Sequence, residues 1–108
     1  EFYAHLTGLA PTWHTDDFAE FVTARGTLAL AHERTLKALG AGVVQPGSNR
    51  SLIIEWLDDD VDATFDRARP HLTDVLQPPT TMPWGNRSML LRDPDGNVVN
   101  VFVRGRRD

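Results

Sequence analysis

Three short stretches in the first third of the chain have a strand-like pattern, and the second of them alternates with the period of two that is typical of β-strands. They cover residues 11–14, 18–22 and 27–31, and polar or glycine-containing turns at 16–17 and 24–26 separate them. Strands joined by such short turns pair with their neighbours in an antiparallel arrangement. We therefore expect a small three-stranded meander.

A helical period appears in the second half of the chain. After a strand-like run at 51–57, apolar residues recur at helical spacing through 61–69. Asp60 precedes this run and is a good N-cap, because its side chain can accept a hydrogen bond from the first turn. Pro70 cannot continue a helix. The pattern predicts a strand followed by a short amphipathic helix that packs on a sheet.

The last quarter of the chain predicts a β-hairpin. An edge strand at 72–77 and a stiff proline-rich loop at 78–83 lead into apolar runs at 88–91 and 98–103. Between these runs lies the turn Asp93-Pro94-Asp95-Gly96-Asn97, whose proline presets φ and whose glycine accepts a positive φ. In the final strand, Val99, Val101 and Val103 share one face, which we expect to meet the helices. The opposite face carries Asn100 between Val98 and Phe102.

The two halves of the chain repeat one order of elements. Residues 1–9 resemble the end of an amphipathic helix stopped by Gly8, and three strands follow it. The second half has a leading strand, a helix and three strands. Residues 33–39 have helical composition, and the glycine-rich segment after them suits a linker. We divide a single domain, 1–108, into module one at 1–39, a linker at 40–49 and module two at 50–104.

Composition narrows the classes of function. The chain has 108 residues, no cysteine and a net charge of −4. The absence of cysteine excludes disulfides, thiolate ligands and cysteine nucleophiles. The negative charge argues against a nucleic-acid partner, and no apolar run approaches the roughly 20 residues that span a bilayer. We expect a cytoplasmic protein with neither a nucleic-acid nor a membrane partner.

The turn at 93–97 with its flanking strands, and the segment from Asp58 to Arg69 with its Asp-Asp-Val-Asp-Ala start, resemble the vicinal-oxygen-chelate superfamily. This group includes glyoxalase I, extradiol dioxygenases and bleomycin-resistance proteins. The resemblance implies an α+β fold of tandem βαβββ modules, which form a curved, cup-like mixed sheet with helices on its outer face. It also implies that the first strand of module one is missing from this sequence.

The resemblance also allows the metal positions of the enzymes in this group to be checked. In those enzymes each module supplies two ligands, one on its first strand and one on its last. Asn100 stands where glutamate is usual, Ala29 is at the matching place in module one, and Ile53 is where histidine is usual. The fourth position lies on the missing strand. Glu55, on the same face as Ile53, is either a displaced ligand or a carboxylate lining the cup. We expect no metal and no other cofactor.

The remaining candidates would bind a ligand in the cup. For the aromatic residues and His14 the alternatives are core packing or simple solvent exposure, and for Asn100 a hydrogen bond to a neighbouring strand. We expect Arg92 to pair with Asp93 or Asp95 in the turn. The candidate ligand-binding residues are Trp13, His14, Glu55, Trp84, Arg87, Asn100 and Phe102.

Three functions fit these observations. The leading hypothesis is metal-free binding, or sequestration, of a small aromatic or cationic molecule in a cup at a homodimer interface, as the resemblance to bleomycin-resistance proteins implies. The alternative is a metal-dependent lyase, isomerase or dioxygenase with a non-standard ligand set such as Glu55 and His14. A third is an accessory module that binds a protein through an open sheet edge.

Overall fold

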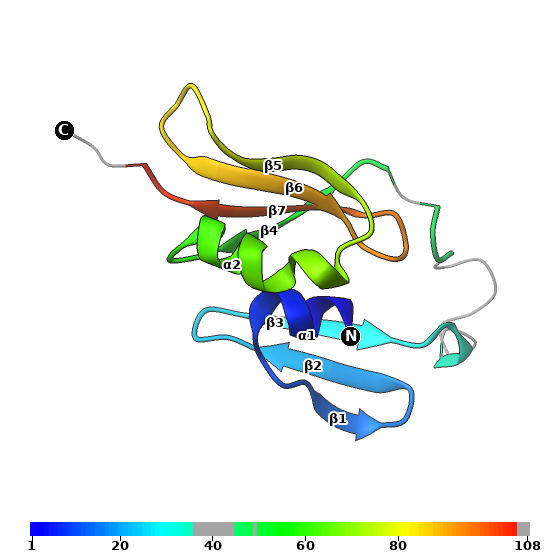
Figure 1. Ribbon diagram of the computed structural model, residues 1–108. Coiled ribbons are helices and arrows are strands. Elements are labelled where there is room, and N and C mark those ends of the chain that lie inside the picture. The colour runs from blue at the N-terminus through cyan, green and yellow to red at the C-terminus, as the bar shows by residue number, and fades with distance from the viewer. Residues whose placement is uncertain (36–44, 49, 106–108) are drawn as a thin grey trace.

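A computed structural model of the chain describes residues 1–35, 45–48 and 50–105. Its first part holds one helix and an antiparallel sheet of order β1-β2-β3 (Figure 1). The described elements of module one are α1 (Phe2–Thr7), β1 (Thr12–Thr15), β2 (Phe18–Val22) and β3 (Thr27–Ala31). The predicted meander is therefore confirmed.

Module two forms a four-stranded sheet of order β4-β7-β6-β5. β4 runs parallel to β7, and the other pairs are antiparallel, so the sheet is mixed. A helix and three strands thus occur in the same order in both modules, and the expected α+β class is confirmed. Its elements are β4 (Ile53–Leu57), α2 (Val61–Ala68), the 3₁₀ turn η2 (Arg69–His71), β5 (Val75–Thr81), β6 (Arg87–Arg92) and β7 (Val98–Val103).

The predicted helix boundaries depend on local chemistry that the structure bears out. Gly8 ends α1 with φ 72°, a left-handed conformation that glycine adopts without strain. The carboxylate of Asp60 accepts a hydrogen bond from the backbone N–H of Ala63 at 3.0 Å and caps α2. Pro70 lies in η2, where the helix has already tightened into a 3₁₀ turn.

The turn between β6 and β7 is held by Asp93. Its carboxylate accepts the backbone N–H groups of Asp95 (3.0 Å) and Asn97 (2.8 Å), and Gly96 has φ 87°. The predicted pairing of Arg92 with Asp93 or Asp95 was wrong. The guanidinium of Arg92 lies 3.7 Å from the carboxylate of Asp74 and donates to the carbonyl of Gly96 at 3.0 Å. Asp93 is already occupied by the turn, so it is not the partner of this side chain.

The fifth strand differs from its prediction. We expected an edge strand at 72–77 and a loop from Pro78, whereas β5 covers Val75–Thr81 and includes both Pro78 and Pro79. Proline is tolerated there because β5 is an edge strand, and its register with β6 shifts at two places. Residues 33–35 form a 3₁₀ turn, and the rest of the predicted helical segment and most of the predicted linker lie outside the described residues.

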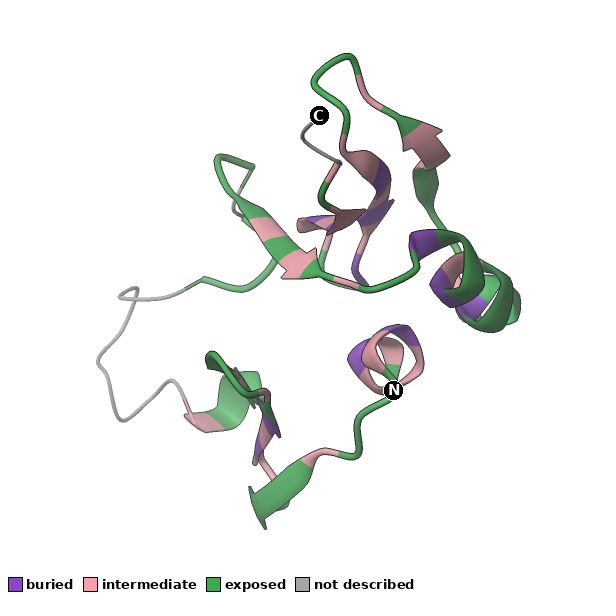
Figure 2. Cartoon of the chain, turned by 90° about the vertical axis from the view of Figure 1, so that its left-hand side faces the viewer, coloured by how far each residue is buried: buried purple, intermediate pink, exposed green. Residues whose placement is uncertain are grey.

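One apolar core joins the two modules. Both helices lie on the same side of the four-stranded sheet, and α1 packs against α2 (Figures 1 and 2). Figure 2 shows the buried positions gathered where the helices meet this sheet, whereas much of module one is exposed. None of the helices within the described ranges has the length and apolar character needed to cross a membrane. The buried core consists of Tyr3, Leu6, Phe21, Val61, Ala68, Met89, Leu91, Val99 and Val101.

Candidate functional site

The two faces of the four-stranded sheet have different roles. Val99 and Val101 are buried beneath the helices, which confirms the prediction made for the all-valine face. On β4 the same side carries Ile54 and Trp56, both half-buried against the core. We call the opposite side the cup face, and on β4 and β7 it consists of Ile53, Glu55, Leu57, Val98, Asn100 and Phe102.

Glu55 and Asn100 form a pair at the centre of the cup face. They are directly opposite in the parallel register of β4 and β7. The side-chain amide of Asn100 donates to Oε1 of Glu55 at 3.2 Å. The amide oxygen of Asn100 is buried and has no hydrogen-bond partner among the described residues. A carboxylate held by an amide, with an unused acceptor beside it, is suited to a group that carries positive charge and N–H donors.

Apolar side chains flank this pair. Ile53 and Leu57 lie on either side of Glu55 along β4 and are 56% and 53% exposed. Phe102 is half-buried on β7, and the guanidinium of Arg104 lies 5.7 Å from its ring centroid. Exposed large apolar residues around one carboxylate provide contact area for the body of an organic cation.

The donor set does not fit a divalent metal. Beside the carboxylate of Glu55, the positions compared with metalloenzymes hold an amide at Asn100 and aliphatic side chains at Ala29 and Ile53. Within the part of the chain that the structure describes, no three histidine, aspartate, glutamate or cysteine residues lie close enough to hold a metal ion. Hard divalent cations need several oxygen or imidazole ligands.

His14 lies in module one beside a carboxylate of the neighbouring strand. Its Nε2 is 2.5 Å from Oε1 of Glu20, and its ring centroid lies 5.7 Å from that of Phe18. Trp13 pairs with Ala19, so these two side chains lie on one face of the sheet, while Glu20 lies on the other; Trp13 is 64% exposed. Successive residues of a strand face opposite sides, so these two neighbouring candidates do not share one surface.

Arg87 lies on the helix side rather than the cup face. Its guanidinium donates two hydrogen bonds to the carboxylate of Asp62 on α2, at 2.6 and 2.8 Å. This contact holds the pKa of Asp62 below its ordinary value and raises that of Arg87. Trp84 is in the turn between β5 and β6 and is 68% exposed. The structure therefore brings together Glu55 and Asn100, but not Arg87.

The structure contains a groove between the two modules that the sequence did not predict. It measures about 620 Å³, and its walls are β4 and the turn between β2 and β3. Trp56 lines this groove. Its indole N–H is buried and has no hydrogen-bond partner among the described residues. No short motif marks this groove, because its two walls are about 30 residues apart in the chain. Its lining comprises residues 23–28 of one wall and Ile54, Glu55, Trp56, Leu57 and Asp59 of the other.

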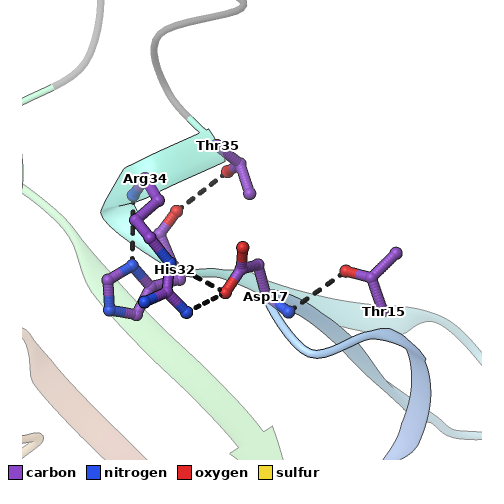
Figure 3. Close-up of polar contacts among 5 residues, drawn as sticks. All are labelled: Thr15, Asp17, His32, Arg34 and Thr35. Carbon is purple, nitrogen blue, oxygen red and sulfur yellow. Dashed lines mark hydrogen bonds and ion pairs between the residues drawn. The ribbon is translucent and has the colours of Figure 1, made fainter.

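A cluster of polar side chains in module one has a structural role. Figure 3 shows the side chains of Arg34 and His32 beside Asp17, which lies in the turn between β1 and β2. Arg34 donates to the Asp17 carboxylate, and the backbone N–H of Arg34 donates to Nδ1 of His32 at 3.1 Å. The bond from Arg34 holds the pKa of Asp17 below its ordinary value. These contacts are made within the chain and attach the 3₁₀ turn at 33–35 to the sheet.

The comparisons with known proteins agree with this architecture. The family model described as Glyoxalase/Bleomycin resistance protein/Dioxygenase superfamily matches residues 1–101. A protein of unknown function from Agrobacterium tumefaciens is similar at 25% identity and TM-score 0.76, over 95% of this chain and 80% of its own. No curated protein matches the sequence.

Two further solved structures share the fold at lower identity. A glyoxalase-related enzyme from Fulvimarina pelagi is 20% identical, with TM-score 0.77, over 95% of this chain and 76% of its own. A glyoxalase/bleomycin resistance protein/dioxygenase family enzyme from Burkholderia phytofirmans is 15% identical, with TM-score 0.80, over 94% and 84%.

Proposed function

The chain belongs to the Glyoxalase/Bleomycin resistance protein/Dioxygenase superfamily, and we propose that it binds a small organic cation with an apolar or aromatic body on its cup face without a metal. The observation that carries this proposal is the Glu55–Asn100 pair. It places one carboxylate and one amide oxygen, which has no hydrogen-bond partner in the described part of the chain, on adjacent strands.

Charge and shape both support a cationic ligand. Glu55 is exposed and keeps a second carboxylate oxygen beyond the one that accepts from Asn100. A cation that donates to a carboxylate makes a stronger hydrogen bond than a neutral donor does. Ile53 and Leu57 on the same face offer apolar contact on both sides of that charge. The net charge of −4 also attracts cations over longer range.

The proposal also includes a homodimer. Large apolar residues remain exposed on the cup face, namely Ile53 and Leu57 of β4. Exposed apolar residues that cluster on one surface are typical of interaction sites. We expect a homodimer in which the cup face is partly covered by the second copy. Light scattering after gel filtration measures the mass directly, and a monomer at all concentrations would remove this part of the proposal.

Calorimetric titration with three matched benzene derivatives tests the function. Benzamidine is cationic, benzamide is neutral and benzoate is anionic, while their rings are the same. We expect benzamidine alone to bind, and binding to persist in EDTA. Glu55→Gln removes the charge but keeps the side-chain shape, so it should weaken benzamidine binding about tenfold or more.

A control variant separates the local effect of Glu55 from that of net charge. Asp66 is exposed on α2, on the helix side, and Asp66→Asn changes the net charge by the same amount. This variant should bind benzamidine as the unaltered protein does. Equal binding of all three compounds, equal effects of the two variants, or loss of binding in EDTA would contradict the proposed function.

A further inference from the structure

The cup face of module two carries two charges of opposite sign that are not paired with each other or with a neighbour. Its strands place Glu55 and Arg92 on this face, and Arg92 lies 3.7 Å from the carboxylate of Asp74. Arg104 directly follows β7, and because it is two residues beyond Phe102 it continues the same face. Neither Glu55 nor Arg104 has an ion-pair partner within the described residues. A negative and a positive group are therefore open to a ligand on one surface.

The positive group lies against an aromatic ring next to the Glu55–Asn100 pair. The guanidinium carbon of Arg104 is 5.7 Å from the ring centroid of Phe102, a distance typical of a cation–π contact. Phe102 is two residues beyond Asn100 on β7, and two residues of a strand span roughly 6–7 Å. Along this strand the order is therefore a carboxylate–amide pair, an aromatic ring and a guanidinium.

The backbone that carries Arg104 is held by the turn between β5 and β6. The N–H of Gly105 donates to Oδ1 of Asn86 at 3.0 Å. A Cβ added at Gly105 would be 2.5 Å from the carbonyl carbon and oxygen of Gly85. Only glycine allows two backbones to approach this closely. Arg104 is thus presented from an anchored segment beside Phe102.

We propose that the ligand of the cup face is a zwitterion, whose cationic end binds Glu55 and Asn100 and whose carboxylate binds Arg104, with an apolar or aromatic body between them. This inference rests on the proposed function and narrows its class of ligand. The guanidinium of Arg104 makes no hydrogen bond within the part of the chain that the structure describes, so its donors are open. A planar guanidinium matches a carboxylate through two parallel N–H bonds.

The balance of charge favours a zwitterion over a simple cation. A ligand with only a positive group satisfies Glu55 but is repelled by the nearby guanidinium of Arg104. A carboxylate at the other end of the ligand replaces this repulsion with a charge-assisted hydrogen bond. Both Glu55 and Arg104 are exposed, so the expected gain in affinity is a few-fold.

Calorimetric titration with para-amidinobenzoate and para-carbamoylbenzamidine tests the proposal. Both compounds carry the same amidinium on the same ring, and they differ only in a carboxylate that the second replaces with an uncharged amide. We expect the unaltered protein to bind para-amidinobenzoate about fivefold more tightly than para-carbamoylbenzamidine.

Arg104→Gln is the decisive variant. It should abolish the preference for para-amidinobenzoate, while para-carbamoylbenzamidine binds at least as tightly as it does to the unaltered protein, because a repelling charge is gone. Retained binding of the second compound shows that the variant is folded and that its cation site is intact.

Arg69→Gln is the matched control. It changes the net charge by the same amount, and the guanidinium of Arg69 also lies near a ring, 5.8 Å from the centroid of Phe65 on α2. This contact is on the helix side of the molecule, away from the cup face. Arg69→Gln should therefore keep the fivefold preference.

The outcomes separate this inference from the proposed function. Equal affinity of the unaltered protein for the two compounds overturns the inference alone, because the cation still binds. A preference that persists in Arg104→Gln, or that Arg69→Gln removes equally, overturns it as well. If neither compound binds, the proposed function is wrong and the inference falls with it.

Discussion

The two modules share one order of elements but differ in how their sheets are completed. In module two, β4 covers the edge of β7, and the residues beneath α2 are buried: Met89, Leu91 and Val99 are 0% exposed. In module one, all four residues of β1 are exposed, and only Ala19 and Phe21 of its sheet are buried. The comparison shows that the same order of elements buries a dense core beneath the helices in module two and leaves most of the sheet of module one exposed.

The largest expected difference concerns core packing in the two sheets. Leu91→Ala removes a fully buried side chain from β6 and should lower the free energy of unfolding by about 2–5 kcal/mol. Leu30→Ala on β3, where the side chain is 39% exposed, should cost about 1 kcal/mol or less. Urea denaturation of both variants measures this, and similar losses would show that the two sheets contribute equally.

The next prediction concerns the hydrogen bond that joins α1 to module two. Tyr3 of α1 donates from its hydroxyl to the carboxylate of Asp93 in the β6–β7 turn at 2.6 Å. Tyr3→Phe keeps the ring and removes this buried bond, at an expected cost of about 1–2 kcal/mol. Urea denaturation gives the value. An unchanged stability would mean that packing of the ring alone holds α1 on module two.

The same hydroxyl predicts a response to alkaline pH. Burial, and then the bond to Asp93, raises the pKa of Tyr3 above its ordinary value of 10.0. The protonated phenol is favoured in the folded state, so this stabilisation is full below pH 10 and is lost as pH rises beyond it. Tyr3 is the single tyrosine of the chain. Tyrosinate absorbance should therefore appear together with unfolding, and titration of the folded protein near pH 10 would contradict this.

The smallest effect is expected at the ion pair on the surface of module two. The Arg87 guanidinium lowers the pKa of Asp62, so the pair stabilises the fold above the ordinary aspartate pKa of 3.8 and is lost as pH falls through the lowered value. Asp62→Asn should melt slightly earlier at neutral pH, and the difference should vanish in acid. A difference that grows as the pH falls would have the wrong sign.

Local signals predicted most of the fold. Gly8, Asp60 and the turn at 93–97 place the ends of elements because each acts through bonds to nearby backbone, and those bonds are present. The alternation of valines in β7 predicted which face is buried. The predicted ends of β5 were wrong, because a strand accepts prolines such as Pro78 and Pro79 only when it lies at the edge of a sheet.

The site could be predicted only in part. Asn100 and Glu55 followed from alternation and from the family's pattern of positions. Arg87 does not lie with them, because its side chain faces α2 and donates to the carboxylate of Asp62. The groove between β3 and β4 depends on how two separate sheets pack, and no spacing of residues along the chain reveals it.

The central claim is that the cup face recognises an organic cation through Glu55 and Asn100 and does not depend on a divalent metal. The most direct measurement is calorimetric titration of EDTA-treated, dialysed protein with benzamidine, and separately with Zn²⁺, Ni²⁺, Mn²⁺ and Fe²⁺ under anaerobic conditions. We predict saturable benzamidine binding that Glu55→Gln weakens, and no stoichiometric uptake of any of the four metals. One tightly bound metal per chain that depends on Glu55, with benzamidine binding only after metal is added, would contradict the account.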